Sequence, residues 1–159
     1  MAKTFMKFLQ QKDATIAEST VEILQDLLSL LKAQDWNYQT THWQVEGDDY
    51  YGNHLLFQRL YEALDEEIDT LGEKIVAYFG ADKVNSPDII TKTHEWIDKW
   101  KGTDNFVKRA ILSEEDMQKM FKASYDALKE RDDLSLGLDD FLMATANAHE
   151  TNLYLLGQL

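Results

Sequence analysis

Residues 42–75 read HWQVEGDDYYGNHLLFQRLYEALDEEIDTLGEKI, and this stretch decides the fold class. It holds the end of one helix, a turn marked by Gly47, and a second helix that continues without a proline to about Phe79. Gly80 then supplies the usual helix stop. Two helices of bundle length joined by a short turn favour an antiparallel pair.

The rest of the chain has a single proline and few glycines, which predicts further helices and no strand. The expected helices span residues 16–44, 53–79, 87–100, 114–131 and 138–156. Asn53, Ser86 and Ser113 stand where capping residues are expected. The short third helix lies in a connection too long for a hairpin. The sequence therefore predicts an all-α fold, a ferritin-like antiparallel four-helix bundle with a short extra helix in the middle connection.

Length and composition limit the architecture and the chemistry. The 159 residues fit one domain, and we expect a short basic tail over residues 1–15 ahead of a bundle over residues 16–159. Cysteine is absent, which excludes disulfides and thiolate metal sites, so any metal must bind to imidazole and carboxylate. The first residues lack the apolar run of a signal peptide, and no segment approaches the ~18 apolar residues of a membrane span. We therefore expect a cytoplasmic protein.

The chain is strongly acidic, with a formal net charge of -13. Lys3, Lys7 and Lys12 form a thin basic tail ahead of the acidic body. This charge opposes binding to phosphate backbones and suits the attraction of cations. Because most acids on such helices simply keep them soluble, the positions of the acids must distinguish a site from a solvated surface.

On the second expected helix, the acids follow a stripe beside the apolar face. At 100° per residue from His54, the stripe falls between about 20° and 100° and the apolar face between about 240° and 340°. The stripe consists of Gln58, Glu62, Asp65, Asp69 and Glu73. His54 and Tyr61 lie near the boundary, so we expect partly desolvated groups there that need partners or a cation. A solvated acidic face is the alternative.

Two histidines flank the Gly47 turn, His42 near the end of one helix and His54 near the start of the next. Two imidazoles with carboxylates suit Fe(II), Zn(II) or Mn(II), whereas Mg(II) and Ca(II) prefer all-oxygen sites. His54 and Glu73 lie about 28 Å apart along one helix, so one chain cannot place both on one ion. A two-fold dimer would bring the histidine end of one helix to the Asp69 and Glu73 end of its antiparallel partner.

With these residues in place, residues 42–75 resemble the Dps family, the starvation-induced mini-ferritins. The positions that match in type and spacing are His42, Trp43, Gly47, His54, Asp69 and Glu73. The resemblance implies a ferroxidase site across a two-fold interface, with both histidines from one chain and both acids from the other. It also implies a cage of twelve subunits that oxidises Fe(II) with hydrogen peroxide or oxygen and stores the Fe(III) mineral.

The chain departs from the family pattern at three positions. Gln58 stands where the family usually has an acid, four residues after the second histidine. A neutral amide is a weaker ligand, so we expect one iron position to be loose or bridged by water. Asn53 replaces the usual Leu or Val. Lys74 replaces the common Arg, and its ammonium cannot form the bidentate hydrogen bonds of a guanidinium group.

Other residues that could carry chemistry give weaker signals. An internal metal site with a Glu-x-x-His motif is incomplete, because Ala146 stands three residues before His149. We expect a structural or interface role for His149 and a packing or surface role for His94. Trp43 could be a core or interface aromatic, or could quench radicals beside bound iron. The acids around the last break could cap helices or line an iron pore; they are Asp132, Asp133, Asp139 and Asp140.

Together with this resemblance, the sequence predicts an iron-storage ferroxidase that oxidises Fe(II) and stores Fe(III), with Zn(II) or Mn(II) as substitutes at the same site. The resemblance implies peroxide as an oxidant and a role in oxidative stress. Its expected metal ligands are His42, His54, Gln58, Asp69 and Glu73. One alternative is a DNA-compacting protein of the same family with weak ferroxidase activity. Another is a non-catalytic helical assembly whose polar stripe is solvated.

Overall fold

The computed structural model describes residues 14–159, with side chains from residue 20 onward. This part of the chain contains helices and no strand. The elements are α2 (Ala14–Gln44), α3 (Tyr50–Phe79), the 3-10 turn η1 (Ala81–Lys83), α4 (Ser86–Trp100), α5 (Phe106–Glu130) and α6 (Leu136–Leu156). The tail predicted over residues 1–15 lies outside the described residues except for its last two positions, which belong to α2.

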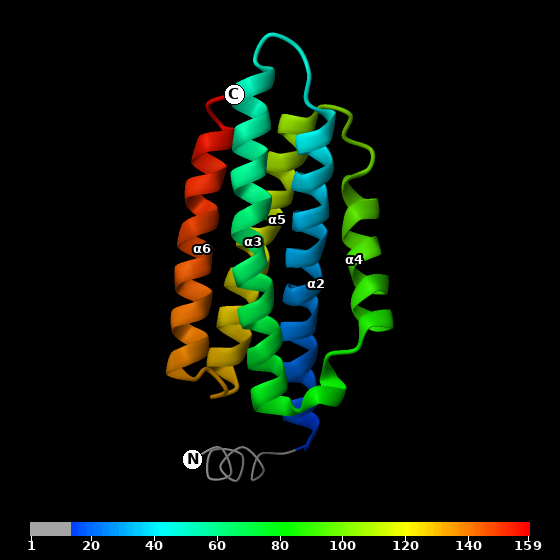
Figure 1. Ribbon diagram of the computed structural model, residues 1–159. Coiled ribbons are helices and arrows are strands. Elements are labelled where there is room, and N and C mark those ends of the chain that lie inside the picture. The colour runs from blue at the N-terminus through cyan, green and yellow to red at the C-terminus, as the bar shows by residue number, and fades with distance from the viewer. Residues whose placement is uncertain (1–13) are drawn as a thin grey trace.

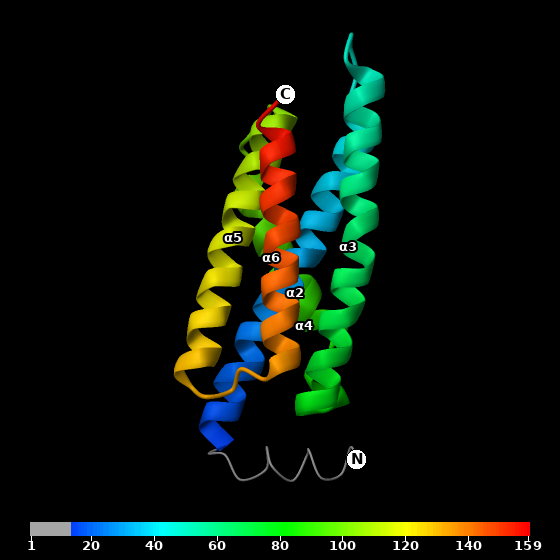
Figure 2. The same cartoon turned by 90° about the vertical axis from the view of Figure 1, so that its left-hand side faces the viewer.

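Four long helices form an antiparallel bundle, which confirms the predicted fold class (Figure 1). α2 and α3 are one hairpin and α5 and α6 are the other, as the side view shows (Figure 2). The long connection between the hairpins carries α4, which lies along the outer side of α2. The loop between α2 and α3 and the carboxyl terminus therefore lie at the same end of the molecule.

The bundle core is built from the apolar faces that the helical periodicity predicts. On α3, every member of the predicted apolar face is buried or half-buried; the members are Phe57, Leu60, Tyr61, Leu64, Ile68, Leu71, Ile75 and Phe79. The fully buried side chains of α2 and α3 include Leu24, Leu27, Leu31, Phe57, Leu60, Leu64, Leu71 and Ile75. Each side chain of this kind contributes roughly 2 kcal/mol when it leaves water, so these two faces hold the first hairpin together.

The second long helix begins earlier than predicted. Asn53 does not cap it; α3 begins at Tyr50 with Asp49 at the cap position, and Asn53 is buried within the first turn. The Asn53 amide donates to the Asp49 carbonyl at 3.0 Å, which continues the helical pattern. The ring of Tyr50 stacks on His54 with centroids 5.0 Å apart, so a side-chain contact supports the added turn.

The caps of α4 and α5 also differ from prediction. Asn85, one residue before Ser86, caps α4 by accepting a hydrogen bond from the Asp88 amide. α5 begins seven residues ahead of Ser113, where the Asn105 side chain accepts from the Lys108 amide. Ser113 is buried within the helix instead of capping it. The acids after Ser113 predicted a helix start there, but Glu114 and Asp116 are buried within α5.

The last helix, α6, begins at Leu136, two residues earlier than predicted, and its cap is a serine. Ser135 accepts a hydrogen bond from the Leu138 amide, so the acids around the break are not the cap of α6. Asp133 instead accepts from the Thr20 hydroxyl at 2.6 Å. Asp132 takes a positive φ of 56°, which turns the chain sharply after α5.

Among the residues that the structure describes, no helix is both long enough and apolar enough to cross a membrane.

Candidate metal centre

The two histidines beside the α2–α3 loop lie in direct contact, as their positions on either side of Gly47 predict. The rings of His42 and His54 stack with centroids 3.8 Å apart and 24° between their planes. Nδ1 of His42 lies 2.9 Å from the His54 carbonyl oxygen, and Nδ1 of His54 lies 3.0 Å from the His42 carbonyl oxygen. This reciprocal pair ties the end of α2 to the start of α3.

The reciprocal bonds determine which ring nitrogens remain available. A carbonyl oxygen only accepts, so Nδ1 of His42 and Nδ1 of His54 must each carry the proton and donate. Each neutral ring then has an unprotonated Nε2 with a free lone pair. Metal-binding histidines commonly use one ring nitrogen as ligand and donate the other to a carbonyl or carboxylate, which fixes the ring. Both Nε2 atoms therefore remain available as ligands.

Aromatic side chains surround the histidine pair. Tyr50 stacks on the far face of His54, and the ring of Tyr61 meets His42 edge-on with centroids 5.4 Å apart. His42, His54 and Tyr61 are half-buried, as predicted for groups at the edge of the apolar face. Trp43 is 63% exposed, so within one chain it belongs to the surface instead of the core.

Asp69 and Glu73 lie in the carboxyl-terminal half of α3 and are both exposed. They face an open groove of about 600 Å³ between α3, α2 and the start of α4. Its other lining residues are Leu28, Lys32, Ile68, Gly72, Val76, Ala77, Val84 and Ile89. The two acids thus form the polar part of a mainly apolar surface, which is a composition suited to contact with another protein surface.

A single chain does not assemble the predicted ligand set. Asp69 and Glu73 lie about 22 Å and 28 Å from His54 along the axis of α3. Among the side chains that the structure describes, those of residues 20–159, no group of three or more His, Asp or Glu is arranged to hold a metal ion. The structure therefore brings His42 and His54 together, places the two acids elsewhere, and leaves each chain with two separate halves of the predicted site.

Gln58 lies one turn after His54 and is half-buried. Its Nε2 donates to Oε1 of Glu62 at 2.8 Å. The remaining acid of the predicted stripe, Asp65, is exposed. His94 is exposed on α4, in agreement with the predicted surface role.

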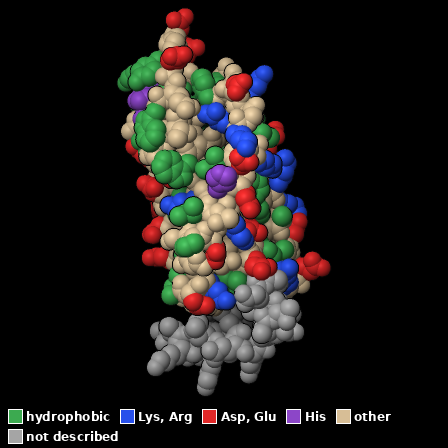
Figure 3. Space-filling model, turned by 90° about the vertical axis from the view of Figure 1, so that its right-hand side faces the viewer, with side chains coloured by type: hydrophobic (Ala, Val, Ile, Leu, Met, Phe, Trp, Pro, Cys, Tyr) green, Lys and Arg blue, Asp and Glu red, His purple; other side chains and the backbone are tan. Residues whose placement is uncertain are grey.

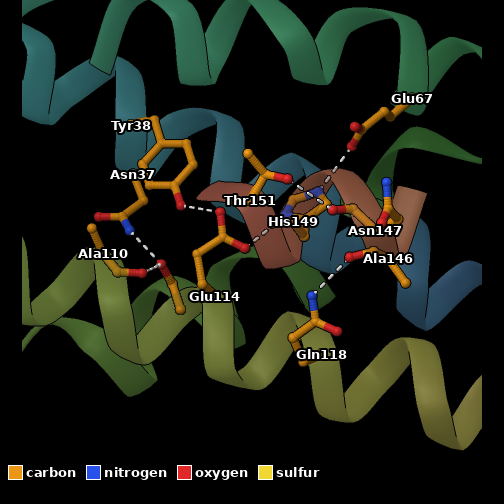
Figure 4. A network of polar contacts seen from close by, with 11 residues as sticks. Asn37, Tyr38, Glu67, Ala110, Glu114, Gln118, Ala146, Asn147, His149 and Thr151 are labelled. Atoms are coloured by element: carbon orange, nitrogen blue, oxygen red, sulfur yellow. Dashed lines mark hydrogen bonds and ion pairs between the residues drawn. The ribbon is translucent and has the colours of Figure 1, made fainter. Parts of the chain in front are cut away.

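A second polar cluster, which sequence reasoning missed, lies inside the bundle around His149 (Figure 4). Nδ1 of His149 lies 2.6 Å from Oε2 of Glu114, and Nε2 lies 3.0 Å from Oε2 of Glu67. Tyr38 donates from its hydroxyl to the other oxygen of Glu114. The four side chains come from α2, α3, α5 and α6, so one hydrogen-bonded chain links all four bundle helices.

The two carboxylates set the charge of His149. Burial alone would lower the pKa of His149, but the hydrogen bonds and charges of Glu114 and Glu67 outweigh burial and raise the pKa to about 9. His149 is therefore an imidazolium at neutral pH. Burial, followed by the charge of Glu114, raises the pKa of Tyr38 well above its ordinary value, so Tyr38 stays a neutral donor. Both nitrogens of His149 are engaged, which makes the cluster an ion-pair network.

The sequence offered one indirect signal for this network. Once α5 is known to begin at Phe106, Glu114 falls on the same helix face as Ala110, Met117 and Phe121, and a glutamate at a core position needs a partner. His149 lies 35 residues from Glu114 and 82 residues from Glu67 in the chain. Such pairs depend on how the two hairpins pack, and no spacing within one helix reveals them.

No family model and no curated protein matches the sequence. Solved structures do match. A Dps of Mycobacterium smegmatis superimposes with a TM-score of 0.75 at 20% identity over 92% of this chain and 89% of that chain. A Dps of Vibrio cholerae, described as a member of the ferritin-like diiron-carboxylate superfamily, gives 0.73 at 16% identity over 92% and 91%. A high-iron form of Dps from Microbacterium arborescens gives 0.71 at 18% identity over 91% and 94%.

Proposed function

From the ferritin-like fold that this chain shares with Dps proteins, we propose that it is an iron-storage subunit and ferroxidase. Fe(II) would bind between two chains related by a two-fold axis, with His42 and His54 from one chain and Asp69 and Glu73 from the other. The observation that carries the proposal is the pair of stacked imidazoles with both Nε2 atoms free, which lies where α2 ends and α3 begins, while the carboxyl-terminal half of α3 presents two exposed acids.

The geometry of α3 explains why two copies are needed. If two copies of α3 pack antiparallel about a point midway between the histidines and the acids, the histidine end of each faces the acid end of the other. One dimer then holds two equivalent sites. The apolar groove around Asp69 and Glu73 provides surface for the partner to cover. Two imidazoles and two carboxylates together form a ligand set suited to Fe(II), with Zn(II) and Mn(II) as competitors.

The proposed reaction at the site transfers one electron from each Fe(II) ion to the oxidant. Carboxylates lower the charge of the bound ions and favour Fe(III) over Fe(II), while the fixed imidazoles hold the ions in place. Two Fe(II) ions each lose one electron, and hydrogen peroxide accepts both electrons and becomes two hydroxide ions. Oxygen is the alternative oxidant. Because both electrons pass to one peroxide molecule, no hydroxyl radical is released.

Storage requires a closed assembly, and we propose the cage of twelve subunits that the family resemblance implies. The acidic body, with its net charge of -13, would attract Fe(II) towards such a shell. The similar structure from Microbacterium arborescens is a high-iron form, which supports iron as the cargo. We place the protein in the cytoplasm, where it would remove iron and peroxide together.

The test is Fe(II) oxidation by peroxide, followed by the absorbance of the Fe(III) product. We expect the wild type to oxidise Fe(II) much faster than buffer does, and the double variant Asp69→Asn/Glu73→Gln to lose at least about 10-fold in rate because both carboxylate ligands are gone. The matched control is Glu95→Gln/Glu115→Gln, which removes two exposed acids from other helices. Equal rates in both double variants would reject the proposed ligands.

A further inference from the structure

Hydrogen bonding fixes the orientation of the side-chain amide of Gln58. Its partner, Glu62, is a carboxylate and only accepts hydrogen bonds, so the NH2 end of Gln58 must point towards Glu62. The oxygen Oε1 of Gln58 then lies at the other end of the amide. No hydrogen bond engages Oε1 of Gln58 among the described residues that surround it. The contact with Glu62 therefore leaves a free acceptor oxygen with a defined orientation.

The helix places this oxygen beside the histidine pair. His54, Gln58 and Glu62 follow one another at intervals of four residues, so they lie one above the other on the same face of α3. Helical side chains lean towards the amino terminus, which brings the carboxylate of Glu62 back over the turn that carries Gln58. The free Oε1 of Gln58 and the free Nε2 of His54 thus belong to side chains one helical turn apart on the same face of α3.

We infer that Glu62 is a positioning residue that orients Gln58 as an oxygen ligand, so that Gln58 and His54 form a second, weaker position for a divalent cation. The inference rests on the proposed function, because this position belongs to the same inter-subunit site. A carboxylate could bind an ion in several orientations, whereas an amide binds only through its oxygen. Because Gln58 stands where the family usually has an acid, only one orientation of its side-chain amide presents the ligand oxygen to the ion. Glu62 fixes that orientation.

Two consequences follow for the ions that the site takes. The position at Gln58 carries no charge of its own, so it should fill after the position that depends on Asp69 and Glu73. The negative charge of Glu62 lies directly behind the amide, where it polarises Oε1 and increases its strength as a ligand. The chain should therefore bind two ions per site in two separate steps.

The experiment is a titration of the intact protein with Co(II), an air-stable ion of similar ligand preference to Fe(II), by calorimetry and visible absorption. In Glu62→Gln, the amide at position 62 can donate as well as accept, so the direction of Gln58 is no longer imposed. We expect the dissociation constant of the second Co(II) to rise roughly 10-fold, as when other groups that orient metal ligands are removed. The dissociation constant of the first Co(II) should stay unchanged. Glu66→Gln, an exposed acid on the same helix, is the control with the same loss of charge.

A rescue variant separates orientation from charge. Gln58→Glu supplies a carboxylate that needs no orienting partner, so Gln58→Glu/Glu62→Gln should bind the second Co(II) as tightly as Gln58→Glu alone. Equal weakening in Glu62→Gln and Glu66→Gln would mean a general charge effect and would overturn the inference while leaving the proposed function intact. Absence of any Co(II) binding by the wild type would reject both.

Discussion

The imidazoles of His42 and His54 each use Nδ1 for a backbone carbonyl of the other residue, and this exchange is the most specific feature of the proposed iron site. It prevents either ring from turning to present Nδ1 to an ion. A single ring flip would break one hydrogen bond and leave a carbonyl without its donor. The site is thus pre-organised before any metal arrives.

This arrangement predicts the tautomers of both histidines. In nitrogen-15 NMR spectra of the neutral, metal-free protein, we expect His42 and His54 to carry the proton on Nδ1, although Nε2–H is the usual tautomer of free histidine. Addition of Zn(II) should shift the Nε2 signals of both residues and leave the Nδ1 protons in place. The exposed His94 serves as an internal control and should show no such preference.

Detection of Nε2–H on either member of the pair would contradict the proposed ligand geometry. The sequence predicted that His42 and His54 approach each other, because a short turn joins their helices. It could not predict the tautomers, which depend on backbone carbonyls that meet only when α2 and α3 pack. Spacing identifies which residues meet, but it does not specify how their hydrogens are arranged.

At the scale of helices, the sequence predicted the number and order of the elements and misplaced several ends. Asn53 and Ser113 are good capping residues, yet both lie inside helices. In each case an aromatic contact accompanies the added residues: Tyr50 stacks on His54 within α3, and Phe106 of α5 packs against Phe57 of α3 with ring centroids 5.8 Å apart. Local propensity is a weak guide where an aromatic contact adds another turn.

The buried network around His149 predicts how the bundle responds to pH. The pKa of His149 is about 9 in the folded chain against an ordinary value of 6.5, so protonation favours the folded state. This contribution is complete below about pH 6.5 and is lost as the pH rises through 9. The shift corresponds to roughly 3 kcal/mol. We therefore expect the free energy of unfolding, measured in urea at fixed protein concentration, to fall between pH 6 and pH 10.

His149→Gln isolates this contribution from the other groups that titrate at high pH. The variant should be less stable than the wild type at pH 6, because Glu67 and Glu114 lose the cation between them. The difference between variant and wild type should shrink as the pH approaches 10. A difference that stays constant over this range would show that His149 is not an imidazolium in the folded chain.

At the scale of the whole molecule, charge separates iron storage from DNA compaction. On the face shown in Figure 3, basic and acidic side chains lie interspersed, and there is no continuous basic surface. Several lysines already pair with carboxylates, such as Lys99 with Asp116 at 2.8 Å. The three lysines of the tail lie outside the described residues. We therefore predict no gel shift of duplex DNA at physiological salt.

A variant with Lys3, Lys7 and Lys12 changed to glutamine is the control for that measurement. Wild type and variant should both leave DNA unshifted at physiological salt. A shift with the wild type that disappears in the variant would favour the DNA-compacting alternative and assign it to the tail. Its strength should then fall steeply with added salt, because each phosphate contact releases counterions.

The division of the site between two chains is the claim on which the whole account depends. The length of α3 predicted it from sequence, since about 28 Å separates His54 from Glu73 along the helix axis. Among the described residues, one chain assembles no group of three or more His, Asp or Glu side chains that could hold a metal ion. The identity of the partner surface could not be derived from spacing alone, because it depends on the groove that α2, α3 and α4 form together.

The most direct measurement is complementation between two inactive variants. His42→Ala/His54→Ala lacks the histidines, and Asp69→Asn/Glu73→Gln lacks the acids. In a mixed two-fold dimer, one site loses every ligand and the other keeps all four, so co-expression in equal amounts should restore about a quarter of the wild-type rate of Fe(II) oxidation, although each variant alone is inactive. Mixtures that remain as inactive as the separate variants would contradict a site shared between chains.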